Sequence, residues 1–104
     1  MATHQVTQYN YQFHGGAHGY RNHRSVLRLN ERNTSVAYVY FMPEGEAIPD
    51  DTESSSGFIR MYMPESTLPS VIDMLRNESP IHIYYAAGSG FLRTGNEPIG
   101  EGED

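Results

Sequence analysis

Only one segment of this chain has the spacing of an amphipathic helix, and it lies at about residues 66–77. Its apolar side chains recur every three or four residues, which places them on one helical face: Leu68, Val71, Ile72 and Leu75. Ser66 or Thr67 can cap the start of this helix, and Pro80 closes it. Because one helix covers only one face of a sheet, any sheet formed by the rest of the chain keeps its other face open.

The other patterned segments are typical of strands. They alternate in polarity or are apolar on both faces, and turns or polar loops separate them: residues 8–13, 25–31, 35–42, 57–63, 81–86 and 91–94. Short connections favour antiparallel neighbours. We therefore expect an α+β fold, a mostly antiparallel sheet of five to six strands with one helix packed on one face, in the order β-β-β-β-α-β-β.

Length and local acidity predict the domain organisation. The chain has 104 residues, enough for one hydrophobic core, and residues 1–96 are expected to form a single domain. Residues 44–56 carry five acids and no base, which predicts a mobile acidic loop. Residues 97–104 carry four acids and predict a flexible tail.

Composition excludes several classes of function. The chain has no cysteine, which rules out disulfides and thiolate metal sites, and every fixed positive charge is an arginine. Residues 1–33 hold four arginines and one acid, whereas residues 34–104 hold three arginines and twelve acids, for a net charge of −6. This acidity argues against general nucleic-acid binding. Without a secretion signal or a membrane-length apolar run, we expect a cytoplasmic protein.

Strand parity divides the side chains between two faces. One face is apolar and predicted to be inward: Tyr9, Tyr11, Phe13, Leu27, Leu29, Ile59, Met61, Met63, Ile81 and Ile83. The other is rich in tyrosine, arginine and amides: Gln8, Asn10, Gln12, Arg28, Tyr38, Tyr40, Arg60, Tyr62, His82 and Tyr84. Tyrosine and arginine are enriched where surfaces bind partners, although tyrosine is also common on half-exposed sheets. Homodimerisation, a ligand platform and an ordinary wet face all fit this pattern.

The segment 14–24, His-Gly-Gly-Ala-His-Gly-Tyr-Arg-Asn-His-Arg, connects the first two predicted strands. His14, His18 and His23 are candidate metal ligands, but the glycines remove the helical geometry that would place them together. Arg21 and Arg24 with the glycine backbone could hold an anion. A mobile polar hairpin loop whose charge depends on pH near neutrality also explains the segment.

These patterns favour a small non-enzymatic binding module with no cofactor and no catalytic residues, homodimeric through the Tyr/Arg face. If a small anionic ligand binds, we expect charge pairing by Arg21, Arg24 and Arg28 and stacking by Tyr38, Tyr40 and Tyr62. One alternative is a small metal- or histidine-dependent enzyme using His14, His18 and His23. Another is an acidic decoy that occupies a nucleic-acid-binding partner.

Overall fold

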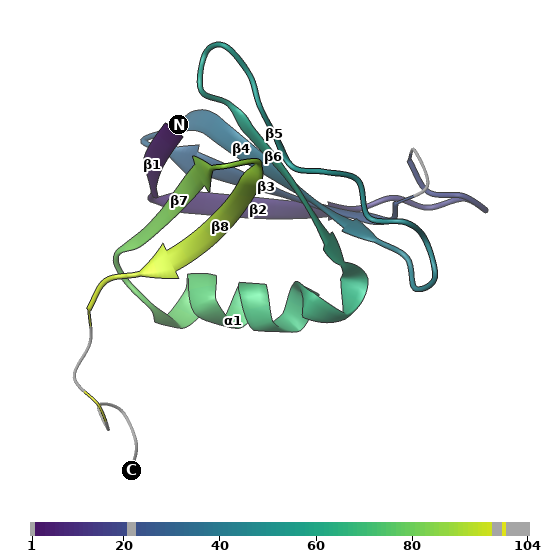
Figure 1. The fold of residues 1–104 in the computed structure, drawn as a ribbon. Coiled ribbons are helices and arrows are strands. Elements are labelled where there is room, and N and C mark those ends of the chain that lie inside the picture. The colour runs from purple at the N-terminus through teal and green to yellow at the C-terminus, as the bar shows by residue number, and fades with distance from the viewer. Residues whose placement is uncertain (1, 21–22, 97–98, 100–104) are drawn as a thin grey trace.

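The computed structural model describes residues 2–20, 23–96 and Ile99, and it confirms the α+β class (Figure 1). Within this part the chain has one α-helix, as predicted, and eight strands in two sheets where one sheet of five to six was expected. The elements are β1 (Ala2–Val6), β2 (Gln8–Phe13), β3 (Ser25–Glu31), β4 (Thr34–Met42), β5 (Thr52–Glu53), β6 (Ile59–Pro64), the 3-10 turn η1 (Glu65–Thr67), α1 (Leu68–Asn77), β7 (Ile81–Ala86) and β8 (Ser89–Thr94).

The larger sheet has the strand order β2-β3-β4-β6-β5, and its β4–β6 pair is parallel. All the other strand pairs are antiparallel. After β4 the chain returns over residues 43–51 to the opposite end of the sheet, and β5 then pairs with β6. Gly57, at φ +88°, lies in the turn before β6, where its N–H donates to the Ser54 carbonyl. This return places β6 parallel to β4, which the rule of short antiparallel connections does not predict.

The smaller sheet has the order β1-β7-β8, and β1 leads into β2 through Thr7 alone. The chain therefore passes from one sheet to the other at this residue. The Thr7 N–H donates to the Asn30 carbonyl at 2.9 Å, and its hydroxyl oxygen accepts the Arg32 N–H at 2.8 Å. The sequence did not predict β1, because Ala2–Val6 has no clear alternation of apolar and polar residues.

The core lies between the larger sheet and a layer formed by α1 together with the smaller sheet (Figure 1). The largest fully buried side chains come mostly from β3, β4 and β6: Phe41, Leu27, Leu29, Ile59, Met61, Ile83 and Val39. β8 approaches β6 closely, because a Cβ on Gly90 would lie 2.6 Å from Met61 Cγ. We call the covered side of the larger sheet its inner face and the opposite side its outer face.

The helix packs through the predicted stripe. Val71 is buried, and Leu68, Ile72 and Leu75 pack against the core. The predicted side-chain cap does not form; instead the Thr67 hydroxyl donates to the Pro64 carbonyl at 2.7 Å. No helix in the described ranges is long and apolar enough to cross a membrane.

The inner face is not covered along its whole width. Tyr11 and Phe13 were predicted to be inward, and they do lie on the inner face, opposite Leu27 and Ser25 of β3. However, they remain 46% and 62% exposed. They border an open groove against α1 instead of packing into the core, because the covering layer does not close over the end of β2.

Candidate binding face

The outer face carries the tyrosines and arginines that strand parity assigned to it from the larger sheet. His82 and Tyr84, assigned to the same face, lie on β7 of the smaller sheet instead. Pairing with β3 places Arg28 beside Tyr38, and the β4–β6 register places Tyr38 beside Arg60 and Tyr40 beside Tyr62. The structure therefore brings Arg28, Tyr38, Tyr40 and Tyr62 to one face, as predicted. A binding role for them stays a prediction.

The rings on this face contact one another. Tyr40 and Tyr62 stack, with centroids 5.1 Å apart and planes 20° apart, and Tyr38 meets Phe58 edge to face at 4.9 Å. His23, at the end of the 14–24 hairpin, meets Tyr40 at 4.8 Å and is 4% exposed. Aromatic pairs of this geometry contribute about 0.5–1.5 kcal/mol each beyond area burial. The rings of this face are therefore held in place by their contacts with one another.

Two arginines lie over rings of the same cluster. The guanidinium carbon of Arg28 is 5.4 Å from the centroid of Tyr38, and that of Arg60 is 5.0 Å from the centroid of Phe58. Contact with an aromatic face orients the guanidinium while its N–H donors stay available at the plane edge. Strand parity assigned Arg60 to this face, but Arg60 was not named as a ligand-binding residue. The β4–β6 register, which places Arg60 beside Tyr38, is what identifies it, and the sequence alone does not give that register.

Two adjacent hollows share Tyr40 and His23 as a common wall. The first, about 210 Å³, is also lined by Arg28, Tyr38, His14, Tyr20, Gln12 and Val26. The second, about 240 Å³, is also lined by Arg60, Tyr62, Met42 and Pro49. Neither described lining contains a carboxylate. Each hollow therefore combines aromatic walls with one fixed positive charge.

Asp51 positions the segment that borders the second hollow. Its Oδ1 accepts the Tyr62 N–H at 2.9 Å, and its Oδ2 accepts the Gly90 N–H at 2.8 Å. One carboxylate thus ties the 43–51 return segment to both sheets, which places Pro49 beside Tyr62. The sequence pattern gave Asp51 no role beyond that of one of the five acids in the predicted mobile loop. The mobility predicted for residues 44–56 stays a prediction, but Asp51 anchors the segment near its end.

The 14–24 hairpin extends the ladder between β2 and β3. The His14 N–H donates to the Arg24 carbonyl at 2.6 Å, and Tyr20 and His23 exchange main-chain hydrogen bonds of 2.8 and 3.0 Å. Gly19 has φ +64°, and a Cβ there would overlap the His23 carbonyl oxygen. Glycine is therefore required at Gly19, where the chain passes close to the main chain of His23.

Of the three predicted anion-binding arginines, Arg24 does not join Arg28 in the first hollow. Arg21 lies outside the described residues. Arg24 donates through Nη1 to the carbonyls of His14 and Gly16 at 3.0 and 3.1 Å, so it braces the hairpin. It also borders a separate hollow whose described lining includes three glutamates: Glu44, Glu46 and Glu65. Its surroundings therefore disfavour an anion.

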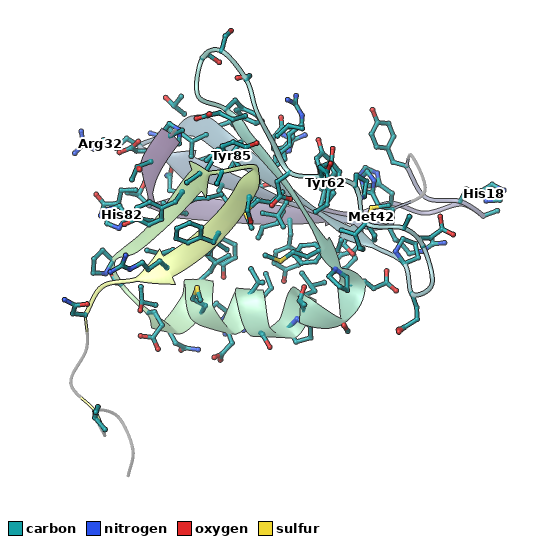
Figure 2. All side chains as sticks on the ribbon, in the orientation of Figure 1. His18, Arg32, Met42, Tyr62, His82 and Tyr85 are labelled. Carbon is teal, nitrogen blue, oxygen red and sulfur yellow. The ribbon has the colours of Figure 1, made fainter. Side chains whose placement is uncertain are left out.

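The predicted histidine set is not arranged as a metal site. The rings of His14 and His23 are edge to face with centroids 6.1 Å apart, and His18 lies at the far tip of the hairpin, well away from Tyr62 (Figure 2). Across residues 2–20, 23–96 and Ile99, no group of three or more His, Asp or Glu side chains has a metal-binding arrangement. His14 and His23 instead contact Tyr20 and act as walls of the first hollow.

Comparisons with protein family models, with curated protein sequences and with solved structures give no significant match to this chain. The geometry of the outer face is therefore the guide to function. That geometry combines preformed aromatic contacts, two oriented guanidiniums and hollows lined without carboxylates.

Proposed function

We propose that this chain is a non-enzymatic binding module whose outer face binds a small anion carrying a flat ring, such as a nucleoside monophosphate. The observation that carries the proposal is the position of Arg28 and Arg60 over Tyr38 and Phe58, on either side of the Tyr40 wall. A planar base suits the aromatic walls, and a phosphate suits a guanidinium that offers parallel N–H donors.

The charge pattern supports a small anion in preference to a long one. The chain has a net charge of −6, and its positive outer face is flanked by a hollow lined with three glutamates. A polyanion would have to pass these acids, whereas a monophosphate contacts only one or two arginines. The proposed ligand therefore matches the size of the positive region.

A homodimer through this same face is less well supported. An isologous interface presents the same patch from both copies. Here both patches would bring arginines, and the described linings of the two hollows offer no carboxylate to meet them. The predicted outer-face homodimer is untested, and the charge pattern favours an anion from outside the chain.

Titration of the full chain with AMP, followed by NMR and calorimetry, tests the proposal. We expect saturable binding with shifts at Tyr38, Tyr40 and Tyr62. Adenosine is expected to bind at least about tenfold more weakly, because a charge-assisted hydrogen bond is lost. Arg28→Gln or Arg60→Gln should lower AMP affinity by a similar factor.

The matched control is Arg93→Gln, which removes an exposed arginine from β8 in the other sheet. It should leave AMP binding unchanged. Equal binding of adenosine and AMP would contradict the role given to the arginines. No saturable binding of AMP, GMP or inorganic phosphate at low-millimolar concentration would overturn the proposed function.

A further inference from the structure

β2 forms an open edge of the larger sheet. It is the end strand in the order β2-β3-β4-β6-β5, and no described strand pairs with its other side. Its sequence, Gln-Tyr-Asn-Tyr-Gln-Phe, contains no charge and no proline. Edge strands are usually protected from pairing by lysine, proline, bulges or short length. At six residues without charge or proline, β2 lacks most of these protections.

Every second main-chain unit of β2 faces this open edge. The His14 N–H donates to the Arg24 carbonyl, so the main chain of His14 bonds toward β3. Because the bonding direction alternates along a strand, the main-chain groups of three further residues also bond to β3: Gln12, Asn10 and Gln8. The N–H and C=O groups of the intervening residues point away from β3: Tyr9, Tyr11 and Phe13. Three N–H donors and three C=O acceptors are thus presented along the open edge of β2.

An apolar strip lies beside the same edge. Tyr11 and Phe13 are 46% and 62% exposed and meet edge to face, with centroids 5.5 Å apart. They form one wall of a groove of about 390 Å³, and Leu68 and Ile72 of α1 form part of the other wall. Exposed aromatic side chains next to unpaired strand groups are the two components of strand-addition interfaces.

We propose that a second copy of this chain pairs antiparallel with β2, about a two-fold axis at Tyr11. In this register Tyr11 faces Tyr11 of the second copy, and Tyr9 faces Phe13 of the second copy. The main-chain groups of Tyr9, Tyr11 and Phe13 in each chain then pair with those of the other chain, which forms six main-chain hydrogen bonds. The inner-face rings become a continuous row, and amides line the outer face.

The charges of α1 identify the second copy as the occupant. Asp73 and Arg76 border the groove beside the exposed rings. A two-fold axis places two copies of α1 antiparallel, so the Asp73 side of one helix faces the Arg76 side of the other, twice. This self-complementarity is absent from the outer face, where both copies would present arginines.

The exposed rings would supply a large part of the area that a dimer needs. A fully buried aromatic side chain removes about 150–250 Å² from water, so the four half-exposed rings supply roughly 400 Å². The strand edges and the α1 side chains would have to supply the remaining roughly 600 Å² of the about 1,000 Å² expected of a specific interface. The inference is independent of the proposed ligand.

A single cysteine tests the register, because the natural chain has none. At a hydrogen-bonded antiparallel pair the Cα atoms are about 5.5 Å apart, within disulfide range. Tyr11→Cys is therefore expected to form a covalent dimer under mild oxidation. Phe13→Cys is the control, because position 13 would lie about 13 Å from its own copy. Equal cross-linking of the two variants would overturn the register.

Native mass spectrometry and light scattering test the interface itself. We expect a dimer, and Phe13→Lys should weaken it at least about tenfold, because two aromatic contacts are lost per dimer. Phe91→Lys, at a 43% exposed phenylalanine of the other sheet, should leave it intact. A strictly monomeric natural chain would refute the proposal. So would a dimer that survives Phe13→Lys but is lost in Tyr62→Lys, which would place the interface on the outer face.

Discussion

Replacing Asp51 with alanine tests whether one carboxylate joins the return segment to both sheets. The substitution removes two hydrogen bonds accepted from main-chain N–H groups, those of Tyr62 and Gly90, at 2.9 and 2.8 Å. Hydrogen bonds to a charged group contribute about 1.5–3 kcal/mol each, but Asp51 is only partly buried and water can replace part of the loss. We therefore expect Asp51→Ala to lower the free energy of unfolding by about 2–4 kcal/mol.

Urea unfolding followed by circular dichroism measures this change, and the midpoint should fall with the slope unchanged. For a domain of this size each kcal/mol corresponds to roughly 4–8 °C in Tm, so thermal unfolding gives a second reading. Asp50→Ala is the matched control, because Asp50 is the exposed neighbouring acid and should change stability by less than about 0.5 kcal/mol. If the two variants are equally stable, Asp51 does not connect the sheets.

Two glycine substitutions test the close approaches on which the site and core depend. Gly19→Ala should increase amide exchange at Tyr20 and at His23, because Gly19 has a positive φ and the added methyl group overlaps the His23 carbonyl oxygen. Gly15→Ala is the control and should not increase this exchange, because Gly15 has open space around it. Equal amide protection in the two variants would contradict this prediction. Gly90→Ala should lower the free energy of unfolding by about 1–3 kcal/mol, because its Cβ meets Met61, and an unchanged urea midpoint would show that the Met61 side chain moves aside without cost.

The fold class followed from period alone, but the topology did not. The stripe from Leu68 to Leu75 and the strand parities depend on local spacing, and local spacing is preserved in the structure. The parallel β4–β6 pair depends on the return of residues 43–51, which has no periodicity of its own. This segment is anchored by the two hydrogen bonds that Asp51 accepts. Their donors, Tyr62 and Gly90, follow Asp51 by 11 and 39 positions in the sequence, and local spacing does not predict contacts between residues so far apart.

The shared face of the candidate residues was predictable for the same reason, whereas their binding role stays a prediction. Tyr38, Tyr40, Tyr62 and Arg28 share a face because parity is strict along a strand. Arg24 was grouped with Arg28 because the two are close in sequence, whereas in the structure its Nη1 donates to the hairpin carbonyls of His14 and Gly16. The histidines were similarly close in sequence, but the structure divides them between two hollows: His14 and His23 line the first hollow, whereas His18 borders the hollow of the three glutamates together with His23.

The two proposals concern opposite faces of one sheet, and they can fail separately. Arg28 and Arg60 lie on the outer face, whereas Tyr11 and Phe13 lie on the inner face beside α1. Gln12 belongs to both regions, because it lines the Arg28 hollow and would lie opposite Asn10 of the second copy. The Asn10 side chain of the second copy would therefore add an uncharged amide at the rim of the Arg28 hollow. The positive groups that would recognise an anion come from β3 and β6 of a single chain, so dimerisation extends the binding face without being a condition for binding.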